Sequence, residues 1–293
     1  MLSLTHWDRR RDAIMGMCEY CGLDAGVLRR RHKECEEKHD RGWQRMIELS
    51  ADAARTGQGH EKLETALAGL ATYSYVPSSK IHEALLAGWE RAAGGAIEDR
   101  VLSVEEESRL SGFVSRFRLS QEELDRNKAW NRIVMAACLR DVLDGKTPSR
   151  INVSGQLPFN FQRSEALVWV FKSVPYYEER TRTRYVGGSS GMSFRLMKGV
   201  YYRTSSFQST PVISAETVQI DSGYLGITTK HIYFTGARKG FRVPYRKIMA
   251  FTPFRDGFGI VRDAASAKPQ VFQTDDGWFA YNLVRNLASR SSD

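Results

Sequence analysis

Three cysteines and one histidine near the N-terminus follow a spacing that restricts the local fold more than any other feature of this chain. Intervals of two, ten and two residues separate the four side chains, which are Cys18, Cys21, His32 and Cys35. A structural Zn²⁺ site takes four thiolate or imidazole ligands in a tetrahedron, and two close pairs can supply them. Gly22 lets the backbone turn back under the metal. We predict a structural zinc site, with three reduced cysteines and a surface histidine as the alternative.

The second pair, His32 and Cys35, is three residues apart, so both side chains can project from the first turn of one helix. Four protein ligands leave no coordination position for water, which favours a structural role over a catalytic one. The arrangement resembles a small treble-clef zinc finger, and we expect the finger and its following helix to span residues 1–58. His39 is left out of the ligand set. Cys138, in the apolar run RIVMAACL, is expected in the core.

The net charge of +9 is unevenly distributed. Residues 1–145 carry 22 Lys and Arg against 24 Asp and Glu, whereas residues 146–293 carry 21 against 10, a net charge of +11. Such an excess favours an acidic partner, which could be nucleic acid, anionic lipid or an acidic protein. A basic surface that only promotes solubility is the alternative.

No apolar run is long enough to span a bilayer, so we expect no transmembrane segment. The first residues, MLSLTHWDRRRD, lack the apolar segment of a secretory signal. We therefore expect a cytoplasmic protein.

Residues 59–148 have the apolar periodicity of helices. Ser103 with Glu106, and Ser120 with Glu123, form two predicted capping boxes, the second opening a helix that runs on through Trp130. The stretch EDRVLSVEEESRLSGFVSRFRLSQEEL resembles the TerB-like family of helical domains. In that family the acidic turn carries Asp-Gly and has been linked to divalent metal. Here the turn is Glu98-Asp99-Arg100, and whether it binds a metal stays open.

Residues 149–293 are rich in β-branched and aromatic residues between glycine turns, and they end in a helical segment, DDGWFAYNLVRNLA. We predict an antiparallel β domain with one C-terminal helix. The segments GYLGITTKHIYF, VPYRKI and DGFGI resemble bacterial PH-like domains of the GRAM-like kind. That resemblance implies a fold, but PH-like domains bind phosphoinositides, proteins or no detectable ligand.

Gly187–Gly191, GGSSG, fits the G-x-S-x-G pattern of a nucleophilic serine at Ser189. A nucleophile elbow needs a strand, a turn and then a helix, but the residues after Gly191 are typical of a strand. We interpret the glycines as a hairpin loop and expect no catalytic residues.

The strand before these glycines carries Arg180, Arg182 and Arg184, which alternation places on one face, and Arg195 follows across the expected loop. Arginine suits forked contacts with phosphate or carboxylate, so we predict a ligand- or partner-binding face. The alternatives are a sheet edge protected by charge and internal pairing with acidic residues.

Together these features predict an α+β multidomain protein made of a zinc finger, an all-α domain and an antiparallel β domain. We expect a non-enzymatic zinc-containing binding or adaptor protein whose basic PH-like domain engages an acidic or phosphate-bearing partner, with a protein favoured. The resemblances imply a setting in bacterial stress or phage defence. The alternative is a nucleic-acid-binding protein that uses the finger, Arg29–Arg31 and the basic β domain. The oligomeric state is left undetermined.

Overall fold

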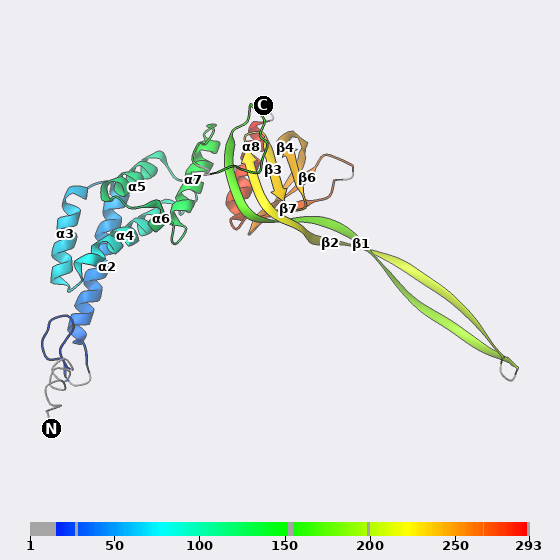
Figure 1. Ribbon diagram of the computed structural model, residues 1–293, viewed down its shortest axis with the longest axis horizontal. Coiled ribbons are helices and arrows are strands. Elements are labelled where there is room, and N and C mark those ends of the chain that lie inside the picture. The colour runs from blue at the N-terminus through cyan, green and yellow to red at the C-terminus, as the bar shows by residue number, and fades with distance from the viewer. Residues whose placement is uncertain (1–15, 27–28, 152–154, 198–199, 266, 292–293) are drawn as a thin grey trace, which may run out of the picture. The chain divides into compact units, whose positions relative to one another are not determined.

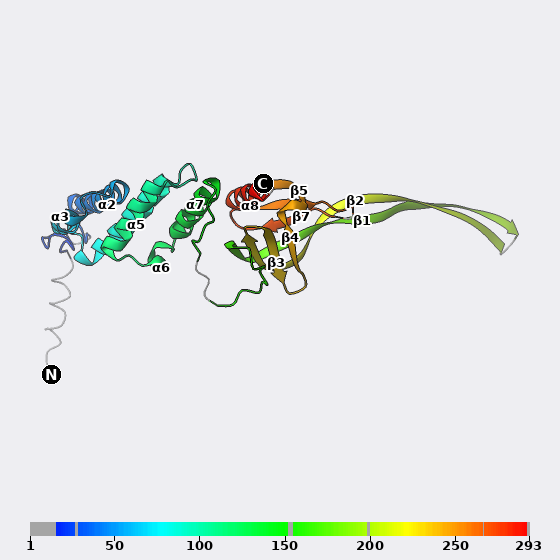
Figure 2. The ribbon, with the colours of Figure 1, turned by 90° about the horizontal axis from the view of Figure 1, so that it is seen from above.

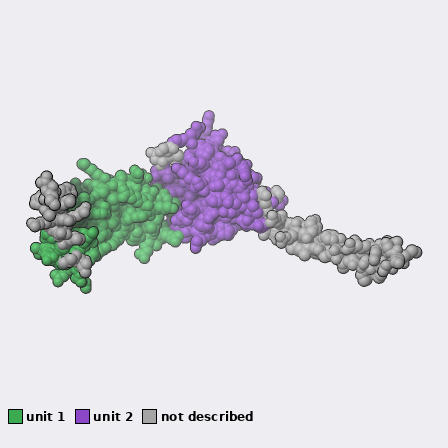
Figure 3. Space-filling view, turned by 60° about the horizontal axis from the view of Figure 1, so that its bottom comes forward, with its two compact units in different colours: residues 1–140 green, residues 141–293 purple. Residues whose placement is uncertain are grey.

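A computed structural model describes residues 16–26, 29–151, 155–197, 200–265 and 267–291, with the side chains of residues 180–215 outside that description. The chain divides into two compact units, residues 1–140 and 141–293 (Figure 3). The first is helical and carries the Cys/His cluster, and the second contains an antiparallel sheet and a C-terminal helix. The α+β class is therefore confirmed.

The described helices of the first unit surround one hydrophobic core, and α2 packs along α4 (Figure 1). The largest fully buried side chains of this core are Trp89, Phe113, Met46, Leu67, Leu102 and Leu124. The helices are α2 (Lys33–Thr56), α3 (His60–Tyr73), α4 (Ile81–Ala96), α5 (Val104–Phe117), α6 (Gln121–Leu124) and α7 (Ala129–Leu143), the last crossing the unit boundary.

Both predicted capping boxes are present. The Ser103 hydroxyl accepts from the Glu106 amide at 3.2 Å, and the Glu106 carboxylate accepts from the Ser103 amide at 3.0 Å. Ser120 and Glu123 repeat the pattern. The helix expected to run from Ser120 through Trp130 is wrong as one element, because the chain leaves helical geometry between α6 and α7. Lys128 has a φ of 58° there, which ends the helical hydrogen bonding.

Two glycines of α4 lie in opposite environments and allow a matched test of the α2–α4 contact. A Cβ on Gly88 would lie 2.3 Å from the Ser50 Cβ and 2.8 Å from the Ala51 amide nitrogen, whereas a Cβ on Gly94 meets nothing within 4 Å. We expect Gly88→Ala to lower the free energy of unfolding by about 1–3 kcal/mol, because backbone must move. Gly94→Ala should raise it by about 0.5–1 kcal/mol through helix propensity. Denaturant melts measure both, and equal shifts would contradict the close packing.

The described strands of the second unit form one seven-stranded antiparallel sheet in the order β4-β3-β2-β1-β7-β6-β5. Helix α8 (Gly277–Arg290) follows β7 and packs against β5 and β6 (Figure 2). Tyr176, Phe234, Phe258 and Phe272 are fully buried. The strands are β1 (Leu167–Met197), β2 (Val200–Thr228), β3 (His231–Gly236), β4 (Gly240–Pro244), β5 (Ile248–Phe254), β6 (Gly257–Arg262) and β7 (Gln270–Gln273).

The glycine-rich segment Gly187–Gly191 is not a loop. It continues as strand β1, with Gly187 opposite Ser209 and Gly191 opposite Ser205, so the hairpin interpretation is wrong at these residues. Glycine permits a turn but does not require one, and here β2 offers a continuous partner for its backbone groups. No helix follows Ser189, since the strand runs on to Met197.

The same register corrects the position of Arg195. It pairs with Tyr201 near the end of β1 and lies on the same strand as Arg184 rather than across a loop. Eleven residues at about 3.3 Å each separate the two by about 36 Å along the strand. Arg180, Arg182 and Arg184 occupy alternate positions of β1 opposite Glu216, Ser214 and Val212. The side chains of all four arginines lie outside the described part of the structure.

Candidate metal centre

The first pair of cysteines lies in a tight hairpin. Met17 and Asp24 form an antiparallel bridge, and the Cys18 amide donates to the Leu23 carbonyl at 2.7 Å. The Gly22 amide donates to the Cys18 carbonyl at 2.9 Å, and Gly22 has a φ of +72°. Only glycine adopts that backbone conformation at little cost, so its position after Cys21 lets the chain fold back and bring both thiols to one side.

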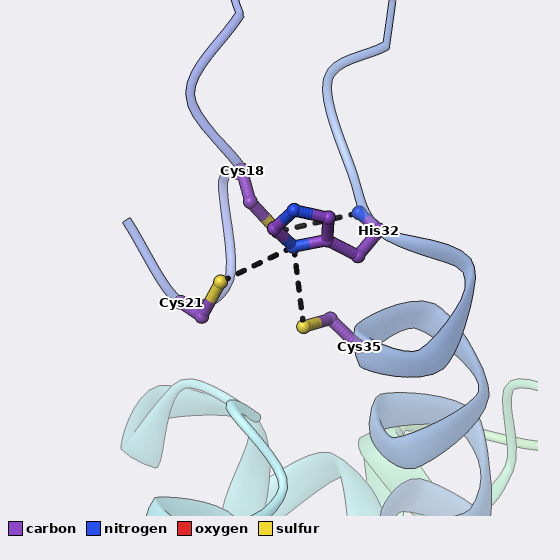
Figure 4. Close-up of side chains that lie close together, drawn as sticks. All are labelled: Cys18, Cys21, His32 and Cys35. Carbon is purple, nitrogen blue, oxygen red and sulfur yellow. Dashed lines mark hydrogen bonds between the residues drawn. The ribbon is translucent and has the colours of Figure 1, made fainter. Parts of the chain in front are cut away.

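The second pair lies at the start of α2. His32 occupies the N-cap position with extended backbone angles, and Cys35 lies in the first turn. The His32 side chain makes no capping hydrogen bond, because it is directed toward the cysteines instead (Figure 4).

The four donor atoms converge on one point. One ligand atom from each of Cys18, Cys21, His32 and Cys35 lies within 4.8 Å of all the others (Figure 4). The Cys21 and Cys35 sulfurs lie 3.3 Å and 3.7 Å from the His32 Nδ1. A tetrahedral zinc site with a metal–sulfur distance of about 2.3 Å has edges of about 3.8 Å, close to these separations. These four residues could therefore hold a metal ion.

A hydrogen bond orients the histidine for metal binding. The His32 Nε2 lies 2.8 Å from the Asp24 carbonyl oxygen. A carbonyl only accepts, so Nε2 carries the proton and Nδ1 presents a lone pair toward the cysteines. The same hydrogen bond raises the pKa of His32. A carbonyl that fixes the tautomer and increases ligand basicity is typical of histidines that bind metal.

The thiols respond differently to their surroundings. Burial by itself would raise the pKa of Cys18, but backbone hydrogen bonds from Cys21, His32 and Tyr20 lower it to about 6. Burial raises the pKa of Cys35 to about 11, and the neighbouring Cys21 and Cys18 thiols add to that rise. Several thiolates cannot share this space without a cation, and a bound divalent ion would remove the penalty.

An aromatic contact joins the cluster to the helices. Tyr20, which lies between Cys18 and Cys21 in the sequence, stacks on His39 of α2 at 4.8 Å between ring centroids and on Tyr75 at 6.2 Å. His39 also contacts the Asp40 carboxylate, and it is not among the residues that converge on the cluster. Sequence reasoning missed the role of Tyr20, although an aromatic residue between paired cysteines was the signal available.

The acidic turn before α5 shows no comparable gathering of ligands. The Asp99 carboxylate accepts from the Val101 amide at 3.1 Å, and Arg100 has a φ of 66°. Glycine adopts this left-handed backbone conformation at less cost than arginine does. Within the described ranges, the Cys/His cluster is the one place where three or more His, Cys, Asp or Glu side chains could hold a metal.

A buried carboxylate in the second unit also escaped sequence reasoning. The side chain of Glu165 has no exposed surface and accepts hydrogen bonds from the Gln162 amide at 2.6 Å, the Thr228 hydroxyl at 2.7 Å and the His231 Nδ1 at 2.9 Å. The Tyr233 hydroxyl donates to it as well. Burial alone would raise the pKa of Glu165, but these hydrogen bonds lower it to about 2. Glu165 therefore fixes the turn between β2 and β3 as an ionised group.

No protein-family model matches the chain, and no curated protein matches it either. Within the described part, no helix combines the length and apolar character needed to cross a membrane. The proposed function therefore depends on the geometry of the Cys/His cluster.

Proposed function

We propose that this chain is a non-enzymatic, zinc-containing binding or adaptor protein whose β unit engages an acidic or phosphate-bearing partner. The carrying observation is the convergence of Cys18, Cys21, His32 and Cys35, since four protein ligands suit a closed structural zinc site rather than a catalytic one. The net charge of +11 on residues 146–293 supports an acidic partner. A protein partner is favoured, in a cytoplasmic setting.

The family resemblances add to this proposal. Antiparallel strands followed by one helix is the order that a PH-like, GRAM-like domain implies, and the second unit has it. The left-handed Arg100 in the acidic turn is compatible with a TerB-like helical domain. We propose bacterial stress or phage defence as the setting of this adaptor role, because these resemblances imply it. The continuation of Gly187–Gly191 as a strand supports a non-enzymatic role, because a serine elbow needs a helix behind it.

Charge reversal on strand β1 tests whether its arginines bind the partner. We expect the triple variant Arg180→Glu, Arg182→Glu and Arg184→Glu to lose a partner that wild type retains from a host extract, and added salt should weaken retention because exposed charges are screened. A control triple at three exposed residues of α2, Arg41→Glu, Arg45→Glu and Arg55→Glu, changes the net charge equally and should retain the partner. Equal capture by all three proteins, compared by quantitative mass spectrometry, would contradict the proposal.

Nucleic-acid binding is the second candidate, and one observation favours it. Arg29, Arg30, Arg31 and Lys33 line a shallow hollow of about 390 Å³ beside the finger. Arg31 already pairs with Glu19 at 2.9 Å and contacts Glu36, which reduces the free charge. If nuclease treatment abolishes capture, and DNA or RNA binds with a steep salt dependence, this alternative replaces the protein partner.

A further inference from the structure

A hollow of about 650 Å³ opens in the second unit, and none of the residues that line it belongs to strand β1 with Arg180, Arg182 and Arg184. Its walls come from the β2–β3 turn, from the end of β4 with the short helix η2 (Tyr245–Lys247), and from the last turn of α8. The volume is in the range of ordinary small-ligand pockets. Residues far apart in sequence meet here, so the chemistry of the hollow is set by the fold.

The lining is strongly basic. Lys230, Arg242, Arg246 and Arg290 contribute four cationic side chains, and none of the residues that line the hollow is Asp or Glu. Within the described part of the chain, none of these four side chains has a carboxylate within 4.0 Å. Like charges in one concave site repel each other, and an anion would relieve that repulsion.

Hydrogen bonds to neutral groups hold two of the cations in place. Arg290 donates to the Lys146 carbonyl at 2.8 Å and to the Gly145 carbonyl. The Lys230 ammonium donates to the Ser164 hydroxyl at 2.8 Å. These contacts position the side chains without cancelling their charge, as in a site prepared for an anion.

The buried carboxylate of Glu165 contacts His231 of the lining, but it does not pair with any of the four cations. The Glu165 oxygens accept hydrogen bonds from Gln162, Thr228, His231 and Tyr233 instead. An ionised carboxylate only accepts, so His231, which lines the hollow, carries its proton on Nδ1. Counting Glu165 against the four cations still leaves a local charge of +3.

We propose that this hollow binds a phosphate-bearing anion with more than one negative charge, held by Lys230, Arg242, Arg246 and Arg290. The inference rests on the proposed function and names a site for the phosphate-bearing ligand. A single carboxylate would leave most of the charge uncompensated, whereas two linked phosphates match it. Guanidinium groups bind phosphate oxygens through paired donors. The source is either a soluble polyphosphate or the headgroup of a phosphorylated lipid.

Calorimetric titration with inorganic pyrophosphate at low salt tests the soluble source. We expect the double variant Arg242→Gln and Arg246→Gln to bind at least about tenfold more weakly than wild type, since each charged hydrogen bond contributes about a factor of ten or more. The matched control is Arg238→Gln with Lys239→Gln, two exposed cations of the β3–β4 turn, which lies at the opposite end of these strands from the hollow. It should bind like wild type.

Co-sedimentation with phosphatidylcholine vesicles containing phosphatidylinositol 4,5-bisphosphate tests the lipid source with the same proteins. Loss of vesicle binding in the pocket variant alone supports the site with a lipid ligand. Equal binding by all variants, or no binding of either probe by wild type, overturns the proposal. If the double variant is unfolded by its melting temperature, the single variant Arg246→Gln replaces it, because no hydrogen bond of that side chain is seen in the described structure.

Partner capture separates this inference from the proposed function. If the pocket variant and wild type capture the same partner while neither binds either phosphate probe, the hollow is not the site and the binding role stands. If phosphate binding depends on the hollow but charge reversal on β1 leaves capture unchanged, the pocket inference stands and the proposed partner surface fails.

Discussion

Replacing Cys21 with serine is expected to release the metal and unfold the finger. Wild-type protein should contain about one zinc per chain, and the variant should contain almost none, because three ligands cannot close a structural tetrahedron. Structural zinc supplies about 10–16 kcal/mol of apparent binding energy in finger peptides at neutral pH, so the local loss should be complete. Elemental analysis measures the metal, and amide hydrogen exchange of residues 16–26 measures the unfolding.

A second cysteine provides the control. Cys138 is fully buried in α7 and lies outside the metal-ligand group, so Cys138→Ser should keep its zinc even if the helices lose stability. The helical core around Trp89 and Phe113 should stay protected in Cys21→Ser, since its contacts are within the helices. Wild-type protein prepared without chelator and found free of zinc would refute the metal assignment, as would full zinc occupancy in Cys21→Ser.

Replacing Glu165 with glutamine is expected to destabilise the second unit by about 2–4 kcal/mol at neutral pH. The carboxylate is buried and accepts from Thr228, His231 and Tyr233, and an amide cannot accept from all of these donors. Denaturant unfolding, monitored by hydrogen exchange of the β3 amides, measures the stability of this unit separately. Asp275→Asn removes one carboxylate at an exposed position and should have little effect, because Asn tolerates its φ of 65°.

The Glu165 contribution should depend on pH in a defined direction. Its folded pKa of about 2 lies below the ordinary value of 4.5, so the stabilisation is fully present above about pH 4.5. It is lost as the pH falls from 4.5 toward 2, on the order of 2 kcal/mol. Glutamine does not titrate, so wild type and Glu165→Gln should converge in stability over this window. A constant difference between them down to pH 2.5 would show that folding does not lower the pKa of this carboxyl.

Local features were predictable from the sequence because their physical causes lie within a few residues. The Cys18–Cys21 pair needs only Gly22 to turn the chain, and His32 with Cys35 needs only the start of a helix. The capping boxes at Ser103 and Ser120 are likewise set by residues three positions apart. The change from helical to strand periodicity indicated which part of the chain is helical and which part forms the sheet.

Tertiary structure decided the features whose causes lie far apart in sequence. Glu165 meets His231 across 66 residues, and the four cations of the hollow come from a turn, a strand, a short helix and the end of α8. Gly187–Gly191 reads as a turn by local propensity, but pairing with Ser205–Ser209 draws it into a strand. The reason is that backbone conformation at a permissive residue, and the ionisation of a buried group, depend on the partners the fold supplies. The spacing of Cys18, Cys21, His32 and Cys35 along a short segment needs no such partner, so the gathering of these four side chains could be predicted from the sequence alone.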